Sequence, residues 1–426
     1  MKKVVITGIG MITAVGNGKD ATWASIKAAK PGIGRITKFD ASRCTCQVAA
    51  EVKGFEEYAI GGGLLDRREA RHMAEFTKYA VAAAVEAWKD AGFADMRKEG
   101  SEGFRPDMDR VGTMLGVGIG GIEVTGESFK TLFDRGPDRL SPLAIPELIS
   151  NEGAGNIAIA IGAKGPAQVV TTACASSSDA LGFALDMIRA GRADVMIAGG
   201  AEATIIEFCV GGFMKEKALA TRFNDAPEKS CRPFNADRDG FVMGEGSAIL
   251  ILESEDHARA RGAKVYAELA GYGATCDSYH ITAPDPSGDG AVKAIEIALR
   301  DAGVADRTTV DYINAHGTST HLNDAMETKA FKEVFGEQAR QISISSTKSM
   351  TGHLLGATGA LEAAVCALAI QEGFVPPTIN YEVPDPECDL DYTPNVGKAR
   401  DIRVAVSTSL GFGGHTGVLV FKKVEG

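Results

Sequence analysis

The chain of 426 residues lacks the cysteine pattern of a disulfide framework or of a zinc site. Its eight cysteines are scattered, and no two of them form a CxxC pair. Secreted domains that depend on disulfides carry denser cysteine frameworks, and structural zinc sites need short ligand spacings. We therefore expect a reduced, cytoplasmic protein without a bound metal.

Basic charge and long apolar runs are also scarce. The chain has 45 lysines and arginines against 56 aspartates and glutamates, a net charge of −11. A protein that binds nucleic acid through its phosphates normally has a basic surplus, so this balance argues against that function. No run of 18 apolar residues occurs, which argues against a membrane span. Glycines interrupt the first apolar run, so we interpret residues 4–7 as a buried strand and not as part of a signal peptide.

A complete dinucleotide-binding fingerprint is absent as well. Gly8-x-Gly10 and Gly116-x-Gly118-x-Gly120 form glycine-rich turns, but neither has the GxGxxG spacing. Neither is part of a convincing βαβ unit with an acidic residue about 20 positions further on. The sequence therefore disfavours a Rossmann cofactor site.

Buried strands alternate with amphipathic helices along the chain, which predicts an α/β protein. We expect the main helices at 19–29, 67–91, 179–190, 290–302, 324–335 and 355–372. We expect the main strands at 4–7, 111–115, 169–172, 194–199, 247–252, 265–272, 310–314, 342–346, 404–410 and 417–422. The strand, turn and helix around residues 342–372 repeat the layout of residues 168–190. This repeat indicates two duplicated halves, residues 1–258 and 259–426.

Cys174 is the first candidate for a catalytic group, because it lies where a predicted strand turns into a predicted helix. The unpaired N–H groups and the dipole of a helix N-terminus can lower a thiol pKa to roughly 3.5–7.5. Small alanines and serines around Cys174 leave room for a substrate. A nucleophile with a lowered pKa and a small core cysteine are both compatible with this turn, and Cys174 by itself does not decide between them.

Three turns in the second half carry further candidates. His316 follows a predicted strand in NAHGTST, Lys348 and His353 follow another in STKSMTGH, and Phe412 stands in GFGG after a third. Ligands of open α/β sheets bind at the carboxyl ends of strands. One histidine at such an end is usually structural, but a cysteine and two histidines at equivalent ends favour catalysis.

These motifs carry a resemblance. TTACASS, NAHGTST, STKSMTGHLLGATGALE and GFGG, together with VVITGIG, GVGIGG, RDGFVMGEG and VPPTIN, resemble the β-ketoacyl-[acyl-carrier-protein] synthases over almost the whole chain. The resemblance implies the thiolase-like fold, two duplicated βαβαβαββ halves packed as a five-layer α-β-α-β-α structure. A Cys–His–His set resembles that of the elongating enzymes, whereas the initiating enzymes carry a Cys–His–Asn set. The segment FVMGEG resembles the type II elongating enzyme more than type I.

The resemblance also implies the chemistry. Cys174 would take an acyl chain from an acyl-carrier thioester, and the N–H groups of Cys174 and Phe412 would form the oxyanion hole. His316 and His353 would donate hydrogen bonds to malonyl-carrier while it loses carbon dioxide, and the resulting enolate would attack the acyl group. Lys348 and Glu362 would pair and orient the histidines. No cofactor is needed.

Further positions match the family by resemblance alone. Thr282, Thr318 and Thr320 match contacts to the pantetheine arm, and Leu115 and Phe213 match the lining of the acyl pocket. Arg68, Arg71 and His72 match a patch that docks the acidic acyl carrier protein, although a solvated charged helix face would also explain them. The resemblance implies a homodimer. Leu410, His415 and Thr416 depart from the family pattern, which leaves the chain-length preference open.

Four alternatives remain at this point. A type II polyketide ketosynthase would share every catalytic residue. A degradative thiolase needs a second cysteine near the last glycine turn, where Phe412 stands, and a non-catalytic chain-length factor would lack Cys174. A Cys–His hydrolase is also compatible with the residues alone.

Overall fold

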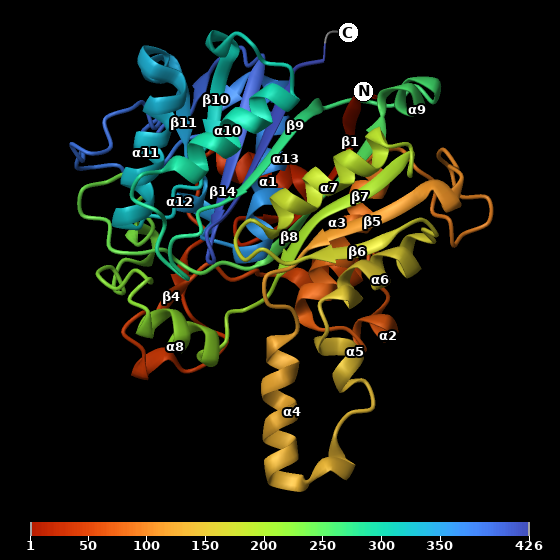
Figure 1. The fold of residues 1–426 in the computed structure, drawn as a ribbon. Helices are drawn as coiled ribbons and strands as arrows, with labels where there is room; N and C mark the ends of the chain where they lie inside the picture. The colour runs from red at the N-terminus through yellow and green to blue at the C-terminus, as the bar shows by residue number, and fades with distance from the viewer. Residues whose placement is uncertain (1, 425–426) are drawn as a thin grey trace.

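The computed structural model describes residues 2–424, so the outermost ends of the two predicted halves, residues 1 and 425–426, lie outside the described residues. The described chain forms an α/β body around one large mixed sheet (Figure 1). Ten strands follow the order β11-β10-β14-β15-β9-β1-β8-β7-β5-β6, and β2 pairs with β1 at the side. The predicted fold class is confirmed.

The strands of this sheet are β1 (Val4–Thr13), β2 (Gly16–Asn17), β5 (Val111–Gly116), β6 (Ala167–Val170), β7 (Val195–Glu202), β8 (Gly246–Ser254), β9 (Ala267–Cys276), β10 (Val310–Asn314), β11 (Ser343–Ser345), β14 (Val404–Gly411) and β15 (His415–Lys422). Two small sheets pair β3 (Gly34–Arg35) with β4 (Val48–Ala49) and β12 (Phe374–Val375) with β13 (Lys398–Ala399).

The helices are α1 (Lys19–Lys27), α2 (Arg67–Ala70), α3 (Glu75–Asp90), α4 (Ile122–Arg135), α5 (Ala144–Leu148), α6 (Asn151–Ile161), α7 (Ser176–Arg189), α8 (Glu207–Lys215), α9 (Glu255–Ala260), α10 (Asp289–Asp301), α11 (His321–Phe335), α12 (Lys348–Thr351) and α13 (Thr358–Glu372). Among residues 2–424, no helix has the length and apolar character needed to cross a membrane.

The strand order repeats along the chain. The N-terminal half-sheet runs β6-β5-β7-β8-β1, and the C-terminal half-sheet runs β11-β10-β14-β15-β9. In each half-sheet the first two pairings are parallel and the last two are antiparallel. Only two residue pairs, Val5 with Glu268 and Ile6 with Ala267, join β1 to β9 and so connect the half-sheets. The division of the domains at residue 258 stays a prediction.

Helices cover the half-sheets in layers. Helix α3 packs on β1, β7 and β8 and α6 on β5 and β6, while α10 packs on β9 and β15. Helices α7 and α13 each contact strands of both half-sheets, so they form a central layer between them. Both helices are apolar and buried over most of their length, as a position between two sheets requires. The arrangement agrees with the five-layer packing expected from the resemblance.

The glycines in the apolar run at residues 4–13 have a packing role. This run has the outline of a signal peptide and contains one of the two glycine-rich turns. A Cβ at Gly8 would lie 2.2 Å from the Ala87 carbonyl oxygen, and one at Gly10 would lie 2.0 Å from that of Ala83. Both glycines therefore let the alanine-rich face of α3 lie directly on β1, and this packing explains them without a phosphate site. Strand β9 has the same arrangement against α10.

The predicted helix at 67–91 is wrong in its length, because the chain breaks it at residues 71–74. Asp66 caps α2 through hydrogen bonds from the N–H groups of Arg68 and Glu69. Helix α3 starts anew at Glu75, whose N–H donates to the Glu123 carboxylate at 2.8 Å. The charged patch of the first helix and the apolar face of the second are therefore separate elements.

Candidate active site

A cavity of about 370 Å³ lies between the two halves. Cys174, His316, His353 and Phe412 all line it, although they are far apart in the sequence. Thr282, Thr318, Thr320 and Phe213 line it as well. The structure therefore brings together eight of the side chains that the sequence and the resemblance selected.

Cys174 is half-buried in the turn between β6 and α7 and lies two residues before the first helical residue, Ser176. Ser176 holds this turn closed, because its Oγ accepts from the Thr172 N–H at 2.9 Å and donates to the Ala173 carbonyl at 2.6 Å. Ala173 has a left-handed backbone conformation with φ of 51°. The predicted strand–turn–helix around Cys174 is confirmed, but the strand is a partly exposed edge strand that ends at Val170 and not a buried one.

The prediction of a lowered thiol pKa is wrong. Burial raises the pKa of Cys174 to about 12, while the positive charge of Lys348 and the hydrogen bond from the Phe412 N–H act in the opposite direction. The buried carboxyl of Glu202 raises it further. Loss of hydration outweighs the helix N-terminus here, so the resting sulfur is a neutral thiol.

His316 lies in the turn after β10, and a buried carboxylate holds that turn. The N–H groups of His316 and Gly317 donate to the two oxygens of Glu327 at 2.7 and 2.8 Å. Burial lowers the pKa of His316 well below its usual value, and the nearby charge of Lys348 lowers it further. Its Nδ1 is buried without a hydrogen-bond partner among the described residues. The ring is therefore a neutral imidazole.

His353 faces His316 across the cavity. The two rings lie 5.3 Å apart, centroid to centroid, and nearly perpendicular at 87°. The Nδ1 of His353 is 2.9 Å from the Thr358 Oγ1, at the start of α13, and its ring packs edge-on against Phe241. Burial and Lys348 lower the pKa of His353 well below its usual value. Two neutral, immobilised imidazoles thus share one cavity.

Lys348 and Glu362 form an ion pair in which both side chains are 1 % exposed. Burial raises the pKa of Glu362 to about 7, although the ammonium of Lys348 opposes the shift. The pair lies behind the cavity wall and does not line it. It places one positive charge close enough to influence the pKa of Cys174, His316 and His353.

Phe412 stands in the turn between β14 and β15, next to the Cys174 turn. A Cβ at Gly411 would lie 2.7 Å from the Thr172 carbonyl oxygen, which shows how closely the two turns approach. The Gly413 N–H donates to the Ile281 carbonyl at 2.8 Å, and the ring of Phe412 lies 6.2 Å from that of Phe213. The Phe412 backbone thus lies close enough to Cys174 to lower its pKa, and Phe412 borders the cavity.

Besides Lys348 and Glu362, four of the selected residues lie outside this cavity. Leu115 is buried at the end of β5, 1 % exposed, and packs near Gly153 of α6. Arg68, Arg71 and His72 are exposed on or just after α2. The roles that the resemblance gave to these four residues stay predictions.

Glu202 and Glu327 are buried carboxylates that the sequence analysis missed. Glu202, the last residue of β7, accepts hydrogen bonds from the N–H groups of Gly118, Ile119, Gly120 and Gly356 at 2.8 to 3.3 Å. It thereby ties the glycine turn after β5 to the segment that follows His353. Its only sequence signal is a charge at the end of an apolar strand.

Comparisons with known proteins agree with this geometry. The family models "Beta-ketoacyl synthase, N-terminal domain" and "Beta-ketoacyl synthase, C-terminal domain" match residues 1–258 and 266–382. The 3-oxoacyl-[acyl-carrier-protein] synthase 2 of Synechocystis sp. is 49 % identical over 424 residues, 100 % of this chain and 99 % of the relative. The protein of the same name from Staphylococcus aureus is 48 % identical over 426 residues, with the same coverage.

A solved structure of similar architecture is a type II polyketide ketosynthase in complex with its acyl-carrier protein and bound to a hexaketide. It superposes with a TM-score of 0.89 at 35 % sequence identity and covers 100 % of both chains.

Proposed function

Because this chain belongs to the β-ketoacyl synthase family, we propose that it elongates fatty acids by two carbons, condensing malonyl-carrier protein with an acyl chain held on Cys174. One observation carries this proposal: a half-buried thiol, two neutral imidazoles and the N–H of Phe412 meet in one cavity. Full-length relatives of 48–49 % identity named 3-oxoacyl-[acyl-carrier-protein] synthase 2 support it.

In the first step the Cys174 sulfur attacks the carbonyl carbon of an acyl-carrier thioester. The N–H groups of Cys174 and Phe412 stabilise the negative charge on the carbonyl oxygen. The thiol proton passes through a neutral imidazole to the carrier thiolate as the old C–S bond breaks. The products are acyl-Cys174 and the free carrier thiol.

In the second step malonyl-carrier loses carbon dioxide, and the electron pair of the broken bond forms an enolate. Neutral His316 and His353 can donate N–H hydrogen bonds to the enolate oxygen. The enolate carbon then attacks acyl-Cys174, the C–S bond breaks, and the Cys174 thiolate takes up a proton. Decarboxylation drives the condensation, so the reaction as written needs no metal or redox cofactor.

The Lys348–Glu362 pair acts as an electrostatic support for both steps. Burial keeps the two histidines neutral and the ammonium of Lys348 adds to this effect, while the same ammonium favours negative charge on the Cys174 sulfur. Glu362 compensates that ammonium in the buried interior.

Thr282, Thr318 and Thr320 line the cavity, where they can contact a pantetheine arm. We assign Phe213, which is half-buried beside Phe412, and Leu115 to the lining of the acyl pocket.

A direct assay tests the proposed function. Purified protein incubated with acyl-carrier protein and malonyl-carrier protein should release carbon dioxide and form the 3-oxoacyl product two carbons longer. Release of free fatty acid without condensation would instead indicate a Cys–His hydrolase. Absence of both products over a range of acyl chain lengths would reject the proposal.

A type II polyketide ketosynthase is the second candidate, and the similar hexaketide-bound ketosynthase favours keeping it. Supplying malonyl-carrier protein with a short acyl primer distinguishes the two. A polyketide enzyme would add several unreduced two-carbon units to one chain, whereas a fatty acid enzyme would stop after a single condensation.

An acyl carrier protein is the expected partner, and Arg68, Arg71 and His72 form its proposed docking patch. Reversal of Arg68 and Arg71 to Glu should raise the KM for carrier-bound substrates about tenfold or more, because the partner is acidic. Reaction with a small acyl thioester should stay unchanged, since the patch lies outside the cavity. Kinetics with both substrates at several salt concentrations measure the effect. Equal loss on both substrates would mean that the patch is structural.

We also propose a homodimer in the cytoplasm. Strand β6 ends the sheet with Ala167 and Gln168 exposed, so a second copy can pair with this edge.

Helix α4 offers a second surface for the partner. It has no buried residue, projects from the body with α5 (Figure 1) and exposes Phe129 and Phe133. Free cysteines fit a reducing compartment. Light scattering should give twice the mass of one chain.

A further inference from the structure

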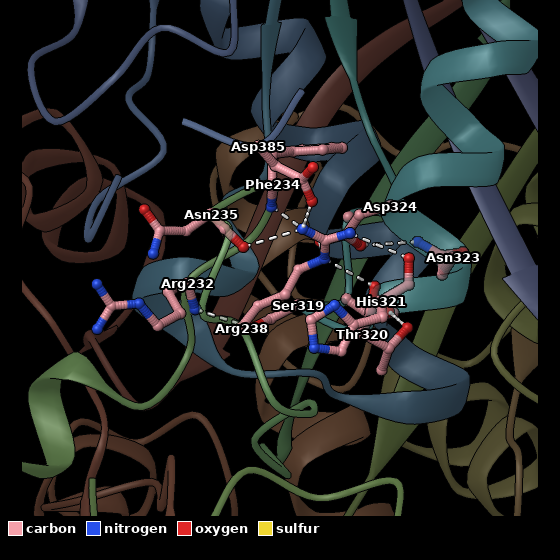
Figure 2. Close-up of polar contacts among 12 residues, drawn as sticks. Arg232, Phe234, Asn235, Arg238, Ser319, Thr320, His321, Asn323, Asp324 and Asp385 are labelled. Atoms are coloured by element: carbon pink, nitrogen blue, oxygen red, sulfur yellow. Dashed lines mark hydrogen bonds and ion pairs between the residues drawn. The ribbon is translucent and has the colours of Figure 1, made fainter. Parts of the chain in front are cut away.

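Arg238 is one of the largest fully buried side chains of the protein, at 1 % exposure, and the proposed mechanism does not use it. Figure 2 shows its guanidinium at the centre of a polar network. Its Nε donates to the Thr320 carbonyl at 3.1 Å and its Nη2 to the His321 carbonyl at 3.1 Å, while Nη1 donates to the Asn235 carbonyl at 2.9 Å. One side chain thus binds three backbone carbonyls.

Two carboxylates compensate the buried charge. Asp385 accepts a hydrogen bond from Nη1, and Asp324 Oδ2 lies 3.4 Å from Nε (Figure 2). Asp324 is itself fully buried and accepts from the Phe234 N–H at 2.8 Å. A planar guanidinium has five donors in a fixed fork, so it can hold these acceptors in several directions at once.

The network joins two segments that line the cavity. Asp239, Gly240 and Phe241, which directly follow Arg238, belong to the first segment, and Phe241 packs against the ring of His353. Thr320 and His321, whose carbonyls Arg238 binds, belong to the second segment. Arg238 therefore fixes the distance between the segment that supports His353 and the segment that follows His316.

The residue just before Thr320 is strained. Ser319 has a left-handed backbone conformation with φ of 70°, which is unfavourable for a residue other than glycine. Its Oγ accepts from the Arg232 N–H at 3.0 Å, and its carbonyl accepts from the Gly240 N–H at 3.0 Å. On either side of Ser319, the hydroxyls of Thr318 and Thr320 lie 2.9 Å apart, and both residues line the cavity. Such a conformation persists only when its surroundings hold it.

We infer that Arg238 is a positioning residue that holds the Thr318–Thr320 turn in its strained form, and so shapes the site for the thioester-bearing arm of the substrate. The inference rests on the proposed function, because it assigns that turn to the pantetheine arm. Arg238 touches no substrate and acts through the backbone of residues 319–321.

The substitution Arg238→Lys tests the role, because lysine keeps the charge but cannot reach all the carbonyls and carboxylates with one ammonium. The KM for a pantetheine-borne thioester should rise about tenfold while kcat changes little, because the chemical groups remain in place. Alkylation of Cys174 by iodoacetamide, which has no pantetheine arm, should keep its rate. Amide hydrogen exchange of residues 317–323 should become faster in the substrate-free protein.

Arg261→Lys is the matched control. Arg261 has a side chain that is 3 % exposed, and it also binds a buried carboxylate, Glu253, and a backbone carbonyl, that of Ala91. It lies outside the residues that line the catalytic cavity. The control should lower the melting temperature to a similar degree and leave both the KM and the exchange of residues 317–323 unchanged.

Asp385→Asn is the second variant if Arg238→Lys does not fold, since Asp385 is partly exposed and its loss weakens the network less. It should give the same changes with smaller size. The inference is overturned if the exchange of residues 317–323 does not increase in either variant, or if kcat falls while the KM stays constant. If the wild-type protein condenses no substrate but the local exchange still increases, the proposed function fails and the tether by Arg238 stands.

Discussion

Replacement of Cys174 by alanine is expected to abolish acyl-enzyme formation completely. No other sulfur lines the cavity with the two histidines in the part of the chain that the structure describes. The thiol is mostly protonated at neutral pH, because burial raises its pKa to about 12, so reactivity depends on its cavity and not on a standing thiolate. Intact mass after incubation with acyl-carrier protein should show an acyl adduct on the wild type and none on the variant.

Cys276→Ala is the matched control for this prediction. Cys276, at the end of β9, is exposed, whereas Cys174 is half-buried and the other six cysteines are buried. Cys276 would therefore react first if exposure alone determined acylation. The control should keep the acyl adduct, and digestion should place it on Cys174. An adduct that survives in the Cys174→Ala variant would reject Cys174 as the nucleophile.

Replacement of His316 or His353 by alanine should suppress malonyl decarboxylation by about 10²–10³-fold, the usual effect of losing one oxyanion donor. Burial keeps both rings neutral, because a lowered pKa means that the protonated form is absent at neutral pH. Acylation of Cys174 should largely persist in each single variant, since the other imidazole can still relay the thiol proton. Carbon dioxide release and intact mass, measured in parallel, separate the two steps.

His257→Ala is a suitable control, because His257 pairs with Glu253 away from the catalytic cavity. It should leave both steps unchanged, whatever it does to stability. If both cavity variants decarboxylate malonyl-carrier protein at the wild-type rate, the histidines do not stabilise the enolate and the mechanism must be revised.

The sequence predicted the elements that carry the site because their signals are local. Cys174, His316 and His353 each come after a strand of the sheet, and strand ends of an α/β sheet converge. The positions of these turns could therefore be predicted before their distances were known. The break at residues 71–74 could not, because it depends on Glu123, which comes from a distant segment.

The errors and omissions have a common physical origin. The pKa of Cys174 was expected to fall because helix N-termini are visible in a sequence, whereas loss of hydration depends on everything that covers the thiol. Glu202 was missed, and Arg238, the first residue of RDGFVMGEG, was given no role, because both bind backbone groups, which every residue has. A sequence motif therefore identifies side chains that contact a substrate more easily than side chains that hold the backbone of a distant turn.

In each half-sheet the strand that comes first in the sequence pairs with the strand that comes last, and this has a consequence for how the chain can fold. Strand β1 pairs with β8 from Val4 against Ser254, and β9 pairs with β15 from Glu268 against Lys422. During synthesis, the β1 edge that pairs with β8 stays unpaired until residue 254 has left the ribosome. The edge of β9 that pairs with β15 stays unpaired until almost the whole chain has been made. Contacts of such long sequence separation slow folding and expose strand edges to other chains. A nascent chain of this protein should therefore depend on chaperones most strongly in the two intervals before each half-sheet can close.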